Sequence, residues 1–221
     1  MPSVSEEASM EVRAFTATDA IAYGWSETKP RLGSLFVVLG FLTWVLGALE
    51  SAAQRHGHAL VHLVLQLLGM LVTIGWWRIS LRLHDTHAAT IEALREVTLL
   101  EAVQYAITIA LYWIATILGL IALVLPGIVI GARLCLAPAI VIDEHRDPLS
   151  ALRRSWELTE GQTVPVLVLG VMLALLNLLG AIPLGLGLIV TMPITFLAVV
   201  HVYRRLAQHH TEVGGYRTAA V

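Results

Sequence analysis

Charged side chains are scarce in this sequence. Asp, Glu, Lys and Arg make up only 14% of the 221 residues, whereas 57% are hydrophobic and the mean hydropathy is +0.77. An ordinary soluble domain contains about 25% charged residues, so this composition excludes that class. The apolar residues come in blocks, and the runs 102–142 and 163–200 are each long enough for two membrane crossings of about 20 residues.

Cysteine and basic clusters are also sparse. Cys135 is the only cysteine, which excludes an intrachain disulfide, and its place in an apolar run predicts a structural rather than a reactive thiol. The net charge is −2 and no block of basic residues occurs, so we expect no nucleic-acid partner. The first 32 residues lack the apolar core of a cleaved signal peptide. We therefore expect the first hydrophobic helix to act as the insertion signal and to stay in place.

Six apolar segments predict six membrane-spanning helices. Pro126 suits the first turn of a helix, where its missing N–H costs nothing, whereas Pro138 and Pro193 lie inside segments and are expected to kink them. Neighbouring helices must then cover the freed carbonyl groups. The predicted fold class is all-α, a polytopic transmembrane helix bundle with amphipathic interfacial helices on the cytoplasmic side. The predicted spans are 33–51, 59–80, 102–124, 126–142, 163–181 and 185–203.

The basic residues orient these spans, because Lys and Arg are enriched in cytoplasmic segments of membrane proteins. Only Arg55 falls on one side, and Arg133 lies inside a span. We therefore expect both termini to lie in the cytoplasm, and we interpret Trp76, Trp77 and Arg78 as an interfacial anchor at the inner end of the second span. The other twelve of the 14 basic residues share the side of both termini: Arg13, Lys29, Arg31, Arg78, Arg82, Arg95, Arg146, Arg153, Arg154, Arg204, Arg205 and Arg217.

A short charged helix is predicted at 147–161, between the fourth and fifth spans. Asp147 is a favourable N-cap, because a carboxylate can accept hydrogen bonds from the free N–H groups of the first turn. Pro148 suits the first helical position, and Gly161 is a typical residue for the end of a helix. The segment therefore carries both a start and a stop signal.

The predicted helix is amphipathic. Leu149, Leu152 and Trp156 recur at i, i+3 and i+7 and form an apolar face, whereas Arg153 and Arg154 project elsewhere. We expect such a helix to lie in the membrane interface, with Trp156 near the headgroups and the arginines near lipid phosphates. It is either a plain connector between spans or a docking or lipid-sensing element.

The start of the chain repeats this helix. Ala20, Trp25 and Thr28 precede an alanine, a tryptophan and a threonine of the charged helix by 131 positions each, and a third, weaker copy is predicted at 90–97. The sequence thus predicts a unit of interfacial helix plus transmembrane hairpin that occurs three times within a single membrane domain. The predicted units are 17–80, 90–142 and 148–205, the membrane domain is 17–206, and polar tails occupy 1–16 and 207–221.

Several segments resemble those of a known group of proteins: LGLIALVLPGI at 118–128, APAIVID at 137–143, ALRRSWELTEG at 151–161, ISLRLHD at 79–85 and YRRL at 203–206. Together they resemble uncharacterised prokaryotic six-helix integral membrane proteins, related to the membrane domain of some glycerophosphodiester phosphodiesterases. The resemblance covers about 17–206. It implies a six-span fold in a prokaryotic cytoplasmic membrane and assigns no activity, and the phosphodiesterase catalytic domain is absent from these residues.

Three polar residues within or near the spans are candidates for a functional site. Arg133 is a charge well inside a span, about 10 Å from the outer end of its helix, and its side chain is expected to lean outward. Glu50 and Asn177, near the outer ends of the first and fifth spans, are the groups that it could meet. Arg133 is either a structural ion pair or snorkelling arginine, or part of a substrate or anion site.

A possible metal site lies at the first outer loop. His58 and His62 are four residues apart, so one helical face could present both, with Glu50 nearby. The alternative is a group of solvated loop histidines, and we expect no cofactor. The sequence provides no nucleophile with an adjacent base and no paired carboxylates within a span, so we expect no enzymatic activity.

Two functional hypotheses follow. The first is a non-enzymatic scaffold, assembly or lipid-interacting module whose partners are the lipid bilayer, other membrane proteins or a second copy of the chain. The second is a small transporter or channel that uses Arg133 and the kinked helices. A water-filled cavity lined by Arg133 and Asn177 would favour the second hypothesis.

Overall fold

Ten helical segments account for most of the part of the chain that the structure describes. This computed structural model describes residues 15–31, 35–55, 58–86, 97–182 and 185–219, and no strand occurs within those ranges. The all-α fold class is therefore confirmed. The segments are α2 (Ala17–Thr28), the 3-10 turn η1 (Lys29–Arg31), α3 (Leu35–Arg55), α4 (Ala59–Thr86), α6 (Leu99–Ala122), α7 (Val124–Leu134), α8 (Ala137–Glu144), α9 (Pro148–Leu158), α10 (Thr163–Ala181) and α11 (Leu188–Ala219).

Six stretches of helix within the described residues are long and apolar enough to cross a membrane. They are α3, α4, α6, the pair α7–α8 taken together, α10 and α11. They follow the predicted spans in order and in approximate position, so the multi-pass membrane character expected from the sequence is confirmed. The predicted third interfacial helix at 90–97 falls almost entirely outside the described residues.

The fourth span is broken rather than continuous. α7 ends at Leu134, and α8 begins at Ala137 with Pro138 in its first turn. A proline ring has no N–H and clashes with the carbonyl group four residues earlier, here that of Leu134, so the kink expected at Pro138 becomes a full break. α11, in contrast, continues as one helix through Pro193.

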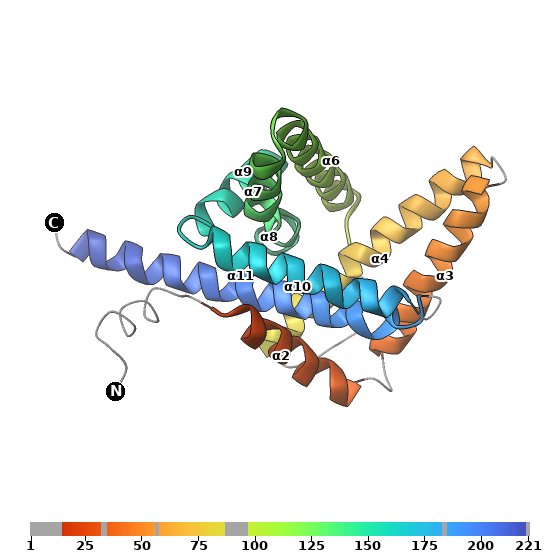
Figure 1. The fold of residues 1–221 in the computed structure, drawn as a ribbon, viewed down its shortest axis with the longest axis horizontal. Coiled ribbons are helices and arrows are strands. Elements are labelled where there is room, and N and C mark those ends of the chain that lie inside the picture. Colours follow the sequence, from red (N-terminus) through yellow and green to blue (C-terminus); the bar gives the residue numbers. More distant parts are fainter. Residues whose placement is uncertain (1–14, 32–34, 56–57, 87–96, 183–184, 220–221) are drawn as a thin grey trace.

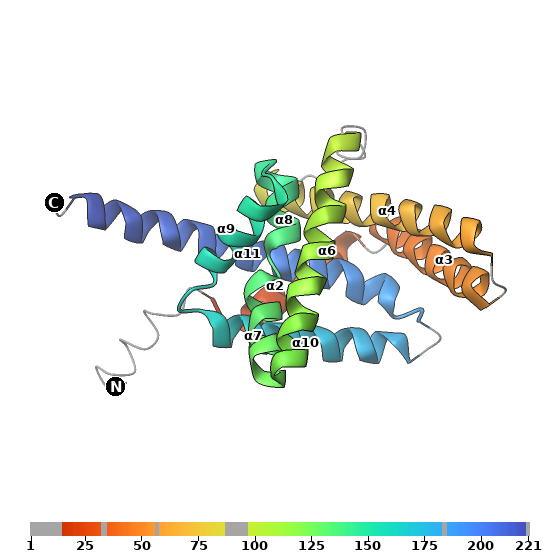
Figure 2. The ribbon, with the colours of Figure 1, turned by 90° about the horizontal axis from the view of Figure 1, so that it is seen from above.

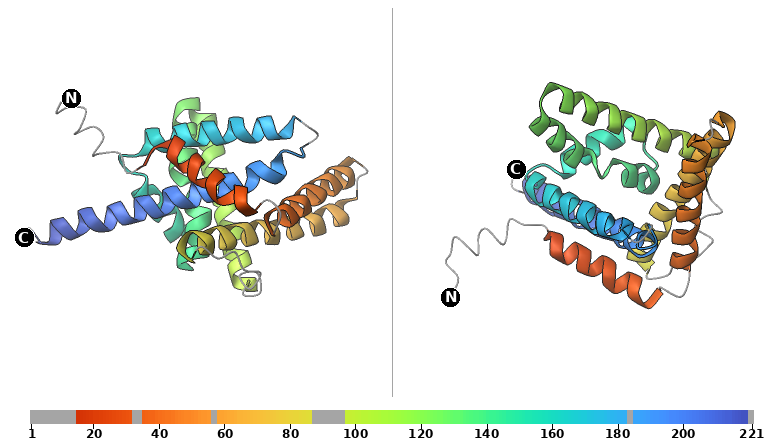
Figure 3. Two further views of the ribbon diagram at one scale, coloured as in Figure 1. Left: turned by 90° about the horizontal axis from the view of Figure 1, so that it is seen from below. Right: turned by 45° about the vertical axis from the view of Figure 1, so that its right-hand side comes forward.

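The spans form three hairpins, α3–α4, α6–α7 and α10–α11. The hairpins α3–α4 and α10–α11 extend toward the same side of the molecule, whereas α6–α7 crosses them (Figures 1 and 2). The two short helices fill the angles between the hairpins. α2 packs against α11 and α10 (Figure 3), and α9 packs against α8, α6 and α7.

The core lies where the last parts of the three hairpins meet. Buried apolar residues run through 74–83 of α4, 137–142 of α8 and 197–206 of α11. Far from this core the apolar side chains are exposed, for example Leu60 at 80% and Leu125 at 77%. Water would disfavour so much exposed apolar surface, whereas the hydrocarbon of a bilayer would cover it.

The prediction that Trp76, Trp77 and Arg78 form an interfacial anchor is wrong. The two indole side chains are only 1% and 7% exposed, and Trp76 stacks on Phe196 with ring centroids 5.6 Å apart. The Trp76 indole N–H also donates a hydrogen bond of 3.1 Å to the hydroxyl of Thr43. α4 packs against α3, α8 and α11, and the two tryptophans are buried among them, so these residues belong to the core.

Glycines allow backbone contact in two of the hairpins. A Cβ atom added at Gly127 of α7 would lie 2.3 Å from the backbone nitrogen of Leu120 in α6, and one added at Gly187 would lie 2.6 Å from the Gly180 carbonyl oxygen. At Gly170 of α10, in contrast, an added Cβ would meet nothing within 4 Å. The glycines of the second and third hairpins therefore set the separation of their helices.

We predict that Gly127→Ala lowers the free energy of unfolding, because the new methyl group must push α6 away from α7. Overpacking of this kind costs about 2 kcal/mol, or roughly 6 °C in the thermal midpoint. Gly170→Ala is the matched control, and there the midpoint is expected to stay unchanged or to rise, because alanine favours a helix over glycine. Thermal unfolding in detergent, followed by circular dichroism, measures both. Equal midpoints for the two variants would contradict the contact between α6 and α7.

Candidate functional site

Polar side chains from all three hairpins meet at the edge of the core. We name this cluster the charged junction. It brings together residues that are far apart in the sequence, since Arg204 and Asp85 are separated by 119 positions. The charged junction consists of Arg78, Asp85, Glu101, Asp143, Glu144, Tyr203 and Arg204.

Arg204 of α11 is the central member of the charged junction. Its two terminal nitrogens donate hydrogen bonds of 2.7 Å each to the two carboxylate oxygens of Asp143 in α8. One of them also donates to Asp85 of α4 at 2.5 Å. A guanidinium group matches a carboxylate in this two-bond geometry, which gives both strength and a fixed orientation. One side chain thus links the three helices that build the core.

Tyr203 strengthens the link between α11 and α8. Its hydroxyl donates a 2.7 Å hydrogen bond to Asp143 and lies 3.0 Å from a carboxylate oxygen of Glu144, while the residue as a whole is only 1% exposed. A buried tyrosine ring with a bonded hydroxyl contributes apolar packing at one end and polar contact at the other. Tyr203 therefore joins the apolar core to the charged junction.

Arg78 and Glu101 form a second, more deeply buried pair. Their side chains are 10% and 4% exposed, and the Arg78 Nε donates to Glu101 at 3.1 Å while a terminal nitrogen donates to the other carboxylate oxygen. Glu101 lies in the first turn of α6, where the free N–H groups favour negative charge, and its own N–H is capped by the Thr98 hydroxyl. The pair fixes α6 against α4, and removing either partner would leave a buried charge without compensation.

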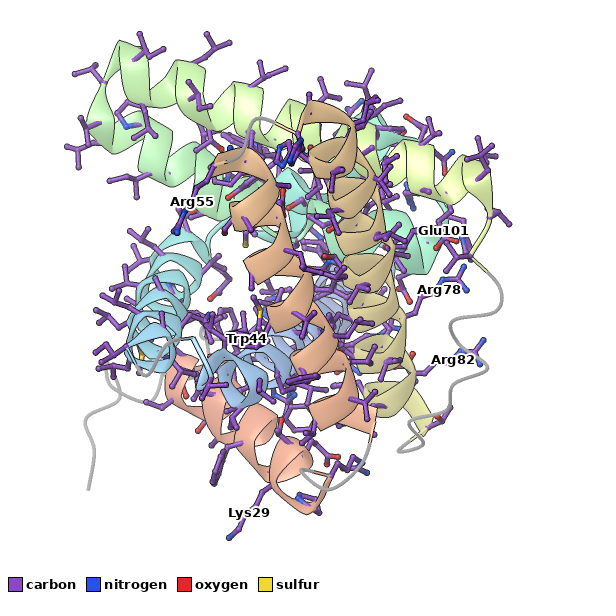
Figure 4. The ribbon with its side chains drawn as sticks, turned by 90° about the vertical axis from the view of Figure 1, so that its right-hand side faces the viewer. Lys29, Trp44, Arg55, Arg78, Arg82 and Glu101 are labelled. Atoms are coloured by element: carbon purple, nitrogen blue, oxygen red, sulfur yellow. The ribbon has the colours of Figure 1, made fainter. Side chains whose placement is uncertain are left out.

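A polar cavity of about 410 Å³ opens beside the charged junction, between α4, α6 and the end of α8. Figure 4 shows Arg78 and Arg82 leaving the same side of α4, with Glu101 next to Arg78. The lining contains both signs of charge in similar measure, which is typical of an ion-pair network and gives little attraction for a strongly charged ligand. The charged lining residues are Arg78, Arg82, Asp85, Glu101, Asp143 and His145.

Arg133 lies elsewhere than the sequence suggested. It does not meet Glu50 or Asn177. Its guanidinium carbon lies 3.9 Å from the centre of the Trp156 ring, and a terminal nitrogen donates to the Trp156 carbonyl at 3.0 Å. The expectation assumed a continuous helix through 126–142, but the break after Leu134 places Arg133 at the end of α7, against α9.

The contact between Arg133 and α9 runs in both directions. The Ser155 hydroxyl donates a 2.7 Å hydrogen bond to the Arg133 carbonyl, and the Thr159 hydroxyl lies 3.2 Å from the same oxygen. The break before Pro138 leaves carbonyl groups at the end of α7 without helical partners, and hydroxyl groups of α9 bind the one of Arg133 instead. The two hydroxyls and the arginine together fasten α9 to the broken span.

The other polar candidates form separate local contacts. Glu50 and His62 approach to 3.7 Å, which joins α3 to α4 near their turn. Asn177 donates a 2.9 Å hydrogen bond to the Thr195 hydroxyl and so joins α10 to α11. Over the described ranges, which include His58, no group of three or more His, Cys, Asp or Glu side chains is arranged to hold a metal ion.

The charged helix begins as predicted, but it presents a different face to the protein. Asp147 accepts a hydrogen bond from the Ser150 N–H at 3.1 Å, and hydrogen bonding by Ser150 lowers the pKa of the Asp147 carboxyl group. Ala151 and Ser155 are fully buried, whereas Leu149 of the predicted apolar face is exposed. Trp156 of that face is partly exposed, with its ring against Arg133.

The polar side of the charged helix carries an exposed ion-pair group. Arg153 lies 3.3 Å and Arg154 lies 3.8 Å from the carboxylate of Glu157, and the Arg153 side chain is 83% exposed. Exposed pairs of this kind contribute little to stability, about 0–1 kcal/mol each. Arg153 thus lies on the surface, in a position to interact with solvent or with lipid phosphates, whereas the Arg154 side chain is only 25% exposed.

α2 and α9 match at the positions that the sequence comparison paired. Thr16 caps α2 by accepting from the Asp19 N–H, as Asp147 caps α9. Ala20 and Thr28 are fully buried, like their counterparts in α9, and Trp25 is partly exposed, like Trp156. The two helices therefore use the same capping and the same buried face.

No known protein family, curated protein or solved structure matches the chain.

We predict that Arg133→Leu lowers the thermal midpoint, because it removes the hydrogen bond and the ring contact to Trp156, worth together about 1–2 kcal/mol. An arginine lying unpaired in hydrocarbon would respond in the opposite direction, since leucine is favoured over arginine there by about 3 kcal/mol. Arg153→Leu, at an exposed position, is the control and should change little. Thermal unfolding in detergent and in lipid nanodiscs measures the sign, and a rise for Arg133→Leu would contradict the contact with α9.

Proposed function

We propose that this protein is a non-enzymatic integral membrane module that holds lipid between its helical hairpins. The observation that carries this proposal is the contrast between its cavities. The polar cavity belongs to the charged junction, where the charges bind one another, whereas the cavities between the hairpins have mainly apolar linings. An apolar cavity that opens between membrane helices is suited to hydrocarbon chains.

The cavity between α4 and α6 illustrates this. It has a volume of about 510 Å³ and is open on one side. Its polar lining groups are few, and most of the surface is contributed by apolar side chains such as Leu67, Met70 and Ile109. α4 and α6 converge at the Arg78–Glu101 pair, so the gap widens away from the charged junction. Lipid chains are the natural occupants of such a gap in a bilayer.

The contacts of the polar candidates favour this proposal over transport. Arg133 is bound to Trp156, and Asn177 is bound to Thr195, and neither lines any of the three cavities described here. A carrier would need such groups to face a shared polar path. The proposed orientation puts both termini in the cytoplasm of a prokaryotic cell, and it rests on the twelve basic residues that share that side.

Added phospholipid is expected to stabilise the purified protein against heat. A ligand at 100 times its dissociation constant adds about 2.7 kcal/mol, which corresponds to roughly 8 °C for a chain of this size. The measurement is the thermal midpoint of delipidated protein in detergent, with and without phospholipid, together with extraction and quantification of the lipid that stays bound. A protein that is freed of lipid without loss of stability, and that shows no shift on its return, would contradict the proposal.

A further inference from the structure

A groove along α3 is larger than either of the two cavities described above. It has a volume of about 670 Å³ and lies between α3 and the first turns of α11. In Figure 4, Trp44 points from α3 toward α11, and Arg55 lies on the same side of α3, nearer to the hairpin turn. We call this cavity the α3 groove. Its lining includes Gly40, Trp44, Gly47, Arg55, Leu188 and Met192.

The inner end of the α3 groove is closed by close helix contact. A Cβ atom added at Gly40 would lie 2.9 Å from the carbonyl oxygen of Ile189, so α3 and α11 touch there. Trp44 closes the groove one helical turn further along α3. A Cβ atom added at Gly185, whose φ is +79°, would lie 3.1 Å from the Trp44 indole nitrogen. α11 begins at Leu188, so beyond this level, toward Arg55, the lining comes from α3 alone.

The floor of the α3 groove is made of small residues. An added Cβ atom at Gly47 would meet nothing within 4 Å, and Ala48, Ser51 and Ala52 follow along the same side of α3. These residues leave a channel where larger side chains would fill the space. The Ser51 hydroxyl donates to the Gly47 carbonyl, so this polar group is already satisfied within the helix. The floor is thus effectively apolar.

A single positive charge stands at the open end of the α3 groove. Arg55 is the last residue of α3, and it is the only Lys or Arg in the segments 47–69, 115–132 and 172–195 that surround the three hairpin turns. The groove therefore combines an apolar channel with a cation near the level of the headgroups. This pairing is complementary to an anionic amphiphile with one hydrocarbon chain in the channel.

The dimensions of the α3 groove favour a chain over a helix. From Gly40 to Arg55 there are 15 residues, which is about 22 Å of helix and exceeds the roughly 15 Å depth of one leaflet. An α-helix of that length and 10 Å diameter would occupy roughly 1,700 Å³. The cavity is open on one side, so a helix could only lie against it, whereas a hydrocarbon chain is thin enough to lie within it.

We propose that the α3 groove binds one acyl chain of an anionic phospholipid, whose phosphate contacts the Arg55 guanidinium. This inference rests on the proposed lipid-holding function and names the lipid class and its site. The chain lies on Gly47 and Ala48, with its end toward Trp44 and Gly40. The lining given for the cavity between α4 and α6 contains no basic residue. Of these two cavities, only the α3 groove is therefore expected to prefer lipids with a negatively charged headgroup.

The test compares the binding of phosphatidylglycerol and phosphatidylcholine with identical chains, by native mass spectrometry of the full chain in detergent. Wild type is expected to prefer phosphatidylglycerol. Arg55→Gln should lower that preference about fivefold, since one arginine near anionic headgroups has roughly that effect. Arg205→Gln, at an exposed arginine of α11 for which no lipid contact is proposed, is its control and should leave the preference unchanged.

A second pair of variants tests the channel itself. Gly47→Leu fills the α3 groove and should reduce the most tightly bound lipid of both classes at least about tenfold, because a filled cavity cannot hold a chain. Gly170→Leu makes the same chemical change at another open position and should bind as wild type does. Size-exclusion chromatography and thermal midpoints establish that each variant is folded. Ala48→Leu replaces Gly47→Leu if the latter does not fold.

The possible outcomes separate the two proposals. If lipid binds equally well to wild type, Arg55→Gln, Gly47→Leu and Ala48→Leu, the proposed lipid site in the α3 groove is wrong. The lipid-holding function would still stand. Wild type that binds no lipid would overturn both. A change from dimer to monomer in Gly47→Leu, with lipid binding unchanged, would also overturn the inference and would identify this face as an interface between two copies.

Discussion

The arrangement of the helices depends on Arg204. Its guanidinium group binds Asp143 through both terminal nitrogens and also reaches Asp85, so α11, α8 and α4 meet at one side chain. The side chains of Asp143 and Arg204 are only 18% and 22% exposed, and a largely buried charge without a partner is costly, so the helices are held in the arrangement in which these groups pair. The buried Arg78–Glu101 pair extends the same constraint to α6. Apolar packing among leucines and valines would allow many alternative arrangements of the helices, whereas these directional contacts specify a single arrangement.

Joining the hairpins at one end shapes the rest of the molecule. Their buried parts, such as 137–142 of α8, gather near the charged junction, and the other ends separate. The apolar cavities along α3 and between α4 and α6 follow from this separation. The same geometry accounts for the short helices, since α2 and α9 occupy the angles at the joined end and turn their apolar tryptophan faces outward. The polar chemistry is therefore used for assembly, and the apolar surfaces are left for lipid.

Local features of the fold could be predicted from the sequence, and long-range contacts could not. Hydropathy located the six spans, and the Asp147 cap and the disturbance at Pro138 follow from neighbouring residues alone. Hydropathy does not distinguish a core tryptophan from an interfacial one, so Trp76 and Trp77 were misplaced. Arg133 was misplaced because its partner Trp156 lies 23 positions away in α9, and local patterns do not show which face of α7 that helix covers. The partners of Arg204 lie 61 and 119 positions away, and no periodic pattern links residues at such distances.

A double-mutant cycle between Arg204 and Asp143 tests the central claim most directly. The free energy of unfolding is measured in mixed detergent micelles for wild type, Arg204→Leu, Asp143→Leu and the double variant. If the charged junction holds the hairpins together, each single change is strongly destabilising and the coupling energy is about 2 kcal/mol, as found for directly bonded groups. Additive effects, with a coupling energy near zero, would contradict the account and would assign the joining of the hairpins to apolar packing alone.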